Sequence, residues 1–350
     1  MAEGIVAIDL FCGAGGLTLG LERAGVKVAA GVDLDDRFRW AYEKNSRSSF
    51  LHANVARLSA EDLKPFYARA RVRVLAGCAP CQPFSTYGRT RSAPDDRWAL
   101  LKSFARIVSE LRPDVVTMEN VPGLRDHEVF DRFVSSLHDN GYGVGHDVVD
   151  CANFGVPQHR RRLVLVGVLQ GRAALPRSTS SEAPSTVRDA IGHLSPLRAG
   201  ETDPRDPLHV ASRLSPLNMA RIRASQPGGT WRDWPEDLRA ACHRRGTGRT
   251  YPSVYGRMRW DEPAPTITTQ CYGFGSGRFG HPEQDRAISL REAALLQSFP
   301  PDWQLFPQGT RPILKAGGTA IGNAVPPKLG EAIGRAILRS VEEAPTAAIS

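Results

Sequence analysis

Two cysteines that stand three positions apart, Cys78 and Cys81, follow a short apolar run from Val72 to Ala76. Such thiols serve proteins as nucleophiles, redox partners or metal ligands. A zinc site would require a second Cys or His pair at ligand spacing, which the sequence lacks. A redox pair normally opens a helix, and Gln82-Pro83 begins one poorly. Cys81 is therefore a candidate nucleophile, with an inert buried thiol as the alternative.

A second apolar run, residues 113–118, ends in the polar pair Glu119 and Asn120. If the two runs are neighbouring strands, Glu119 and Cys81 converge on one crevice at the edge of a sheet. A carboxylic acid beside a thiolate suits an addition in which the acid supports the developing charge. Without Cys81, Glu119 would instead be interpreted as an acid near the start of a helix.

Three consecutive arginines, Arg160 to Arg162, precede a third apolar run. In a strand, Arg160 and Arg162 would share one face, so both guanidinium groups could enter the crevice together. A solvated or phosphate-binding patch is the simpler interpretation of the same run.

Strand-like and helix-like segments alternate through the first half of the chain and provide the scaffold that these groups need. The alternation predicts βαβ units and a mostly parallel, doubly wound α/β sheet. The expected strands are residues 5–10, 26–32, 72–76, 114–118, 144–149 and 163–168, and the expected helices are 17–24, 37–44, 60–70, 98–111 and 127–138.

The first expected strand leads into a Gly-rich turn, Phe11 to Gly16, which is typical of nucleotide-binding βα units. Thr18 stands where the G-x-G-x-x-G pattern has its third glycine. Asp33, at the end of the second strand, is placed to hold ribose hydroxyls. A glycine cluster without a ligand is the alternative.

After residue 170 the chain becomes rich in Pro, Ser, Gly and Arg and loses any sustained period. We expect one domain from residues 1–170 and 318–350, and a smaller, loop-rich domain from residues 171–317. The last helix, about Pro327 to Val341, has an apolar stripe that must cover a sheet, so it returns the chain to its first domain.

Composition bears on partners and compartment. The net charge of +8 admits a polyanionic partner, although arginine-rich codon usage alone would produce it. No apolar run approaches the roughly 20 residues that span a bilayer, and no signal-peptide pattern is present, so we expect a cytoplasmic protein without membrane contact. The six scattered cysteines are expected to be free thiols, and no metal site is expected.

Six motifs, in a fixed order, resemble those of the S-adenosylmethionine-dependent cytosine-5 DNA methyltransferases of bacteria. The similarity covers nearly the whole chain except residues 171 to about 253, and the ordered set is far more specific than any single motif. The motifs are Asp9-Leu10-Phe11-Cys12-Gly13-Ala14-Gly15-Gly16, Pro80-Cys81-Gln82, Glu119-Asn120-Val121, Gln158-x-Arg160-x-Arg162, Pro265-Thr266-Ile267-Thr268 and Gly322-Asn323-Ala324-Val325-Pro326-Pro327.

The resemblance implies a Rossmann-like class I methyltransferase fold and methyl transfer to C5 of a cytosine flipped out of a specific duplex DNA sequence. It implies that Cys81 adds to C6, that Glu119 hydrogen-bonds or protonates N3, and that C5 then attacks the sulfonium methyl. By the same match, Arg162 binds the base oxygen O2 and Arg160 supports the intermediate. Cys78 then becomes a bystander.

The resemblance also implies which residues contact S-adenosylmethionine. They are Phe11, Gly13, Gly15, Asp33, Leu34, Asn54, Pro80, Leu100, Asn323 and Val325. Asn54 replaces an acid that often meets the adenine amino group, and it offers a neutral carbonyl acceptor instead.

Residues 171–317 become a target-recognition domain. DNA contacts are expected at Arg257 in this domain and in the loop of residues 82–97, which would close over the flipped base. The loop residues concerned are Gln82, Ser85, Arg89 and Arg91. Trp231 and Trp234 are better explained as core residues than as base wedges, and His243 as an incidental neighbour of Cys242 than as a metal ligand.

Two other activities stay open. A tRNA cytosine-5 methyltransferase shares these motifs, whereas a nicotinamide-dependent oxidoreductase would use the first βα turn and leave Cys81 and Glu119 without a role. The expected partners are double-stranded DNA and, unless the enzyme is solitary, a companion restriction endonuclease that forms no stable complex with it. The expected state is a monomer.

Overall fold

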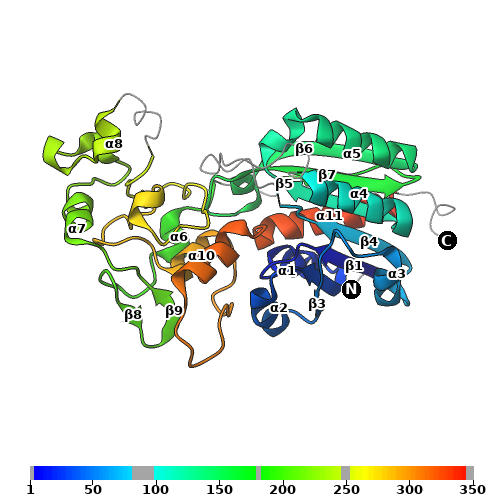
Figure 1. Ribbon diagram of the computed structural model, residues 1–350, viewed down its shortest axis with the longest axis horizontal. Helices are drawn as coiled ribbons and strands as arrows, with labels where there is room; N and C mark the ends of the chain where they lie inside the picture. The colour runs from blue at the N-terminus through cyan, green and yellow to red at the C-terminus, as the bar shows by residue number, and fades with distance from the viewer. Residues whose placement is uncertain (1–3, 81–97, 179–182, 246–252, 344–350) are drawn as a thin grey trace. The chain divides into compact units, whose positions relative to one another are not determined.

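The computed structural model describes residues 4–80, 98–178, 183–245 and 253–343. The chain divides into two compact units, whose elements are labelled in Figure 1. Unit 1 comprises Met1–Phe154, Arg161–Thr179 and Val325–Ser350, and unit 2 comprises Gly155–Arg160 and Ser180–Ala324. Every helix within the described ranges is too short or too polar to cross a membrane.

Unit 1 is built on a seven-stranded sheet with the order β3-β2-β1-β4-β5-β7-β6. Strands β1 to β5 are parallel, and β7 runs antiparallel to both of its neighbours, β5 and β6. This confirms the expected mostly parallel sheet. The strands are β1 Ile5–Leu10, β2 Lys27–Asp33, β3 Ser49–His52, β4 Val72–Gly77, β5 Val115–Asn120, β6 Tyr142–Asp150 and β7 Arg161–Leu169.

Strand β3 was not expected from the sequence. It has only four residues, of which Phe50 alone is buried, so it carries too little hydrophobic pattern to be noticed. It nevertheless pairs with β2 and forms the edge of the sheet beyond that strand, where Asp33 lies opposite His52.

The helices of unit 1 are α1 Gly16–Arg23, α2 Arg39–Asn45, α3 Ala60–Leu63, α4 Ala99–Leu111, α5 Glu128–Asp139 and α11 Pro327–Glu342. The strand order runs in opposite directions from β1 and from β4, so right-handed crossovers place the connecting helices on both faces of the sheet. Helix α3 is shorter than expected. Pro65 disfavours helical backbone in the residue before it, and the chain continues as a 3-10 turn, Lys64–Tyr67.

Helix α11 returns the chain to unit 1, as the sequence predicts. Its apolar stripe is fully buried at Leu329, Ile333 and Ile337. The helix packs closely on α1, because a Cβ atom at Gly20 would lie 2.5 Å from backbone atoms of Gly330. The two helix backbones are therefore in direct contact.

The unit boundaries differ from the expected domain boundaries. Residues 155–160 belong to unit 2, since the His159 N–H donates to the Ala264 carbonyl (2.8 Å). Residues 318–324 also belong to unit 2, because they continue helix α10, Leu314–Asn323.

Residues 171–179, expected in the smaller domain, belong to unit 1 instead. The Ala174 N–H donates to the Ser340 hydroxyl of α11 (2.9 Å), and Arg339 donates to the Leu175 carbonyl (3.0 Å). These bonds keep the strand-to-loop exit after β7 on the surface of α11.

Unit 2 contains short elements joined by long loops. They are α6 Val187–Ile191, β8 Thr202–Asp203, β9 Asp206–Val210, α7 Pro216–Arg223, α8 Ala241–Arg244, α9 Leu290–Leu296 and α10 Leu314–Asn323. One of its cores contains Ile222, Trp231, Trp234 and Phe274, which confirms that the two tryptophans are core residues. The expected capping box at the start of α9 is present between Ser289 and Glu292.

Candidate functional site

The Gly-rich turn after β1 has a strained backbone. Gly13 and Gly15 adopt positive φ angles of 51° and 90°, and so does the bulky Phe11, at 62°. A large side chain in this conformation costs free energy, which persists only where the surroundings enforce it. A Cβ atom at Gly13 would meet nothing within 4 Å, so this backbone borders open space.

Asp33, at the end of β2, binds this turn. Its Oδ2 accepts the Gly13 N–H (2.8 Å) and its Oδ1 accepts the Asp35 N–H (2.9 Å). Burial raises the pKa of Asp33, against the lowering effect of these two N–H groups. Leu34 follows with 63% of its surface exposed, although it is apolar. The structure thus brings Gly13, Asp33 and Leu34 together at the carboxyl ends of β1 and β2, where open α/β sheets bind ligands.

The other residues expected to contact the cofactor are placed less tightly. The side-chain oxygen Oδ1 of Asn54 already accepts the Ala56 N–H (3.0 Å). Leu100 lies half-buried in the first turn of α4, and Pro80 is exposed after β4. Asn323 belongs to unit 2, whereas Val325 belongs to unit 1 and is buried.

A buried polar chain beneath the Gly-rich turn was missed by the sequence analysis. The Thr18 hydroxyl donates to Asp9 (2.7 Å) and lies 3.0 Å from the Tyr42 hydroxyl. Burial raises the pKa of Asp9 to about 7, despite the Thr18 hydrogen bond. The replacement of the third glycine by Thr18 was the available signal, because a hydroxyl at that helix position requires a polar partner when buried.

Strand β5 carries Glu119 to the carboxyl edge of the sheet, beside the end of β4. Strands β4 and β5 are parallel neighbours, and Gly77 pairs with Met118, so the next residues, Cys78 and Glu119, lie side by side. The Cys78 thiol donates to Oε2 of Glu119 (2.8 Å). Cys78, which was expected to be a bystander, therefore contacts the candidate catalytic acid.

Arg162 completes this cluster from the start of β7. Its Nε lies 2.9 Å from Oε1 of Glu119, and the side chains are 13% and 3% exposed. Asn120, the next residue of β5, is also buried and donates to the Ala79 carbonyl (3.0 Å). Two consecutive side chains of β5 therefore bind the residues that follow β4: Glu119 binds Cys78, and Asn120 binds Ala79.

Arg160 binds other partners than Arg162 does. Strand β7 begins only at Arg161, so the alternation that would put both arginines on one face does not include Arg160. Arg160 is 3% exposed in unit 2 and donates to the carbonyls of Ile267 (2.8 Å), Gly322 (3.0 Å) and Ala324 (3.4 Å). These bonds commit its guanidinium group to the backbone of unit 2.

Gln158 of the same motif has an equally internal role. It is fully buried, donates to the Leu296 carbonyl (3.1 Å) and to the Gln297 side chain (2.6 Å), and accepts the Ile267 N–H (2.8 Å). The motif therefore joins residues 155–160 to the rest of unit 2.

Arg257, expected to contact DNA, is buried in unit 2. Its guanidinium group donates to the carbonyls of Ile222 (2.9 Å) and His281 (2.9 Å), and it pairs with Asp285 (2.5 Å). With 4% of its surface exposed, it holds loops of unit 2 together, and we correct the expectation accordingly.

Cys81, Gln82, Ser85, Arg89 and Arg91 lie outside the described residues. Among the described residues, no group of three or more His, Cys, Asp or Glu side chains is arranged to hold a metal ion. His243 stacks on Trp231 with ring centroids 4.2 Å apart, which accounts for its position.

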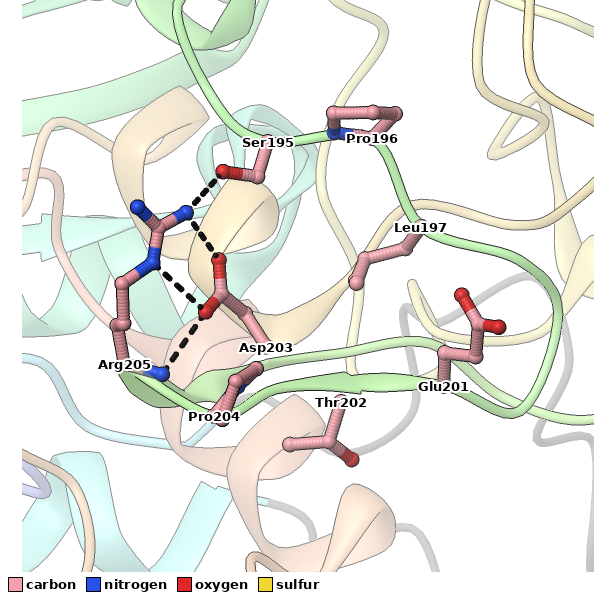
Figure 2. A pocket seen from close by; sticks show the side chains of 8 residues that line it. All are labelled: Ser195, Pro196, Leu197, Glu201, Thr202, Asp203, Pro204 and Arg205. Atoms are coloured by element: carbon pink, nitrogen blue, oxygen red, sulfur yellow. Dashed lines mark hydrogen bonds and ion pairs between the residues drawn. The ribbon is translucent and has the colours of Figure 1, made fainter.

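A shallow pocket of about 450 Å³ lies in unit 2 around the β8–β9 hairpin (Figure 2). Arg205 there donates to Ser195 (2.6 Å) and to Asp203 (3.3 Å), as Figure 2 shows. None of the residues expected to act in chemistry lines it. Asp203 and Arg205 pair with each other, and Glu201 accepts the Arg198 N–H (2.7 Å).

Comparisons with known proteins agree with the sequence motifs. A family model described as C-5 cytosine-specific DNA methylase matches residues 5–339. The Type II methylase M.HgiDII of Herpetosiphon aurantiacus is 49% identical, over 96% of this chain and 95% of the relative. The Type II methyltransferase M.PspPI of Psychrobacter is 33% identical, over 97% of this chain and 80% of the relative.

Solved structures share the fold. A structure described as a putative DNA modification methyltransferase from an Escherichia coli prophage superposes with a TM-score of 0.74 at 24% identity, over 97% of this chain and 100% of the other. A DNMT2 structure from Spodoptera frugiperda gives a TM-score of 0.63 at 17% identity, with the same coverage.

Proposed function

We propose that this chain, which belongs to the C-5 cytosine-specific DNA methylase family, methylates cytosine in duplex DNA through a covalent adduct of Cys81. The observation that best supports this mechanism is the buried Glu119–Arg162 pair at the carboxyl end of β5, beside the strand that leads to Cys81. Family membership removes the nicotinamide-dependent oxidoreductase from consideration.

The chemistry requires both a nucleophile and an acid. C5 of cytosine is too weak a carbon nucleophile to take a methyl group unless a thiolate first adds to C6. In the proposal Cys81 makes this addition, and Glu119 hydrogen-bonds or protonates N3 so that the ring becomes electron-rich at C5. Arg162 holds the Glu119 carboxylate through the 2.9 Å contact and binds the base oxygen O2. The base must leave the stack of the duplex to reach these groups.

The first βα turn fits S-adenosylmethionine. The positive-φ backbone at Gly13 borders open space, the Asp33 carboxylate has lone pairs left for ribose hydroxyls, and the exposed Leu34 offers an apolar surface to an adenine ring. When bound, S-adenosylmethionine supplies an electrophilic methyl group. Phe11, Gly13, Gly15, Asp33 and Leu34 are the described residues that we assign to holding it.

Arg160 has a different part in this proposal from the one that the resemblance implies. Its bonds to the carbonyls of Ile267, Gly322 and Ala324 support a role in holding unit 2 together. We assign base contact to Arg162 alone.

We assign DNA recognition to unit 2. The exposed arginines of this unit, which include Arg213, Arg232 and Arg245, support phosphate contacts. The relatives named as Type II enzymes support a role in restriction and modification. To this role we add, as parts of the same proposal, a companion endonuclease, a cytoplasmic location and a monomeric state. Sequencing of methylated cytosines in a host that expresses the protein would identify the target.

The direct test of the mechanism is a duplex that contains 5-fluorocytosine, incubated with the protein and S-adenosylmethionine. Fluorine at C5 cannot leave as a proton does, so the adduct persists and peptide mapping should find the DNA on Cys81. Cys81→Ala should form no adduct and should still bind S-adenosylmethionine by calorimetry, because other residues hold the cofactor. An adduct in Cys81→Ala would refute the mechanism, and faster methylation of tRNA than of duplex DNA would assign the other substrate.

A further inference from the structure

We propose that Cys78 is a positioning residue for Glu119 in methyl transfer. The inference rests on the proposed function, because it assumes that Glu119 acts on the cytosine ring. Cys78 itself is not assigned a bond to the base or to the cofactor.

Each oxygen of the Glu119 carboxylate contacts a different residue. The Cys78 thiol donates to Oε2 (2.8 Å), and Arg162 Nε lies 2.9 Å from Oε1. One contact alone would let the carboxylate rotate about its terminal bond, whereas a hydrogen bond at Oε2 and an ion pair at Oε1 restrict that rotation. Because Glu119 is 3% exposed, water contributes little to this orientation.

The backbone around Cys78 is held on both sides. The Cys78 N–H donates to the Leu10 carbonyl at the end of β1 (3.3 Å), and the Ala79 carbonyl accepts from Asn120 (3.0 Å). The thiol is thus presented to Glu119 by backbone that two neighbouring strands fix. This arrangement makes the contact a consequence of the sheet register rather than of a chance rotamer.

A thiol suits this task because it is a neutral and weak donor. Its hydrogen bond orients the carboxylate without adding a second positive charge beside Arg162. An incoming base can replace a weak donor at Oε2 more easily than it could replace a second guanidinium group. Cys78 therefore keeps the carboxylate aligned until the base arrives.

The test compares Cys78→Ala with Cys78→Ser, which keeps a hydroxyl donor at the same place. We expect Cys78→Ala to lower kcat for methylation of duplex DNA by about tenfold, as loss of a hydrogen bond to a charged group does. Cys78→Ser should retain the parent kcat within about twofold. Cys242→Ala, which removes an exposed thiol of unit 2, is the control and should leave kcat unchanged.

A double variant shows whether Cys78 acts through Glu119. If it does, adding Cys78→Ala to Glu119→Gln should change kcat less than it changes the parent. Calorimetry with S-adenosylmethionine shows whether each variant is folded. Parental kcat in Cys78→Ala, or full additivity in the double variant, would overturn the proposal. A Glu119→Gln enzyme with parental kcat would instead refute the role of Glu119, and so the proposed function.

Discussion

Side chains that are neighbours in one motif have separate tasks in the structure. Arg162 pairs with Glu119 in unit 1, whereas Arg160, two positions earlier, binds backbone carbonyls in unit 2. The change of unit falls between them, at the start of β7. Residue type and spacing therefore identified the motif but not the partner of each arginine.

The internal role of Arg257 can be tested by its contribution to stability. Arg257→Ala should lower the free energy of unfolding of the protein by about 3 kcal/mol or more, because it removes hydrogen bonds to several buried carbonyls and the ion pair with Asp285, which keeps its longer contact with Arg223. The control is Arg259→Ala, since Arg259 is exposed and forms a surface pair with Glu262. That change should shift the unfolding free energy by less than about 1 kcal/mol.

Chemical denaturation of both variants measures these differences. Equal stability of Arg257→Ala and the parent, together with weaker DNA binding, would restore the original expectation that Arg257 contacts DNA. A matching loss of stability in Arg259→Ala would mean that burial does not distinguish the two arginines.

At the scale of elements, the contact between α1 and α11 connects the cofactor turn to the end of the chain. Gly15 caps α1, and Gly20 lies against Gly330 of α11. The helix that begins at the proposed cofactor site is therefore held in place by a helix some 300 positions later in the chain.

Gly20→Ala tests this contact. Helix propensity alone would make the change stabilising by about 1 kcal/mol. The added Cβ, however, would lie 2.5 Å from backbone atoms of Gly330 and Glu331, which cannot move aside as a flexible side chain can. We therefore expect a net loss of about 1–3 kcal/mol in the free energy of unfolding.

Thermal unfolding with and without S-adenosylmethionine measures the effect of Gly20→Ala. Arg23→Ala, an exposed change on the same helix, should stay within about 0.5 kcal/mol of the parent. A stabilised Gly20→Ala protein would show that α1 and α11 are not in backbone contact.

At the scale of the whole molecule, three buried groups make stability depend on pH: His281 and Glu292 in unit 2, and Asp9 in unit 1 with the opposite sign. In unit 2, burial lowers the pKa of His281 to about 4. Burial would raise the pKa of Glu292, but hydrogen bonds from Arg286 outweigh it and hold that pKa at about 2. The unfolded chain takes up these protons at higher pH than the folded chain does, so unit 2 loses stability as pH falls from about 6.5.

In unit 1, Asp9 has the opposite effect. Its pKa of about 7 in the folded protein lies above the value in the unfolded chain. The stability that depends on a protonated Asp9 is therefore fully present below about pH 4 and is lost as pH rises to 7. Asp9→Asn removes this loss. We expect the variant to gain stability relative to the parent by a few kcal/mol between pH 4 and pH 7, at about 1.4 kcal/mol per pKa unit.

Denaturant unfolding of Asp9→Asn and of the parent at a series of pH values measures this difference. Parallel curves for the two proteins would show that Asp9 titrates normally. Thr18→Val is the companion variant, since loss of its hydroxyl removes the hydrogen bond that partly offsets the effect of burial on Asp9.

The sequence by itself determined the parts of this protein that depend on local pattern and on motif order. Apolar runs located most strands of the sheet, and polar residues at their ends located Glu119 and Asp33. The ordered motifs identified the family. These features can be predicted because periodicity and strand-end chemistry are properties of short segments.

Only the tertiary structure decided which side chains meet. The register of β4 and β5 gave Cys78 its contact with Glu119, and Arg160 and Arg162 found different partners, backbone carbonyls of unit 2 and Glu119 of unit 1. Burial turned Arg257 from a surface candidate into an internal brace. Each outcome depends on distances between segments far apart in the chain, and a hydrogen bond forms only within about 3 Å. Spacing along the sequence does not specify such distances.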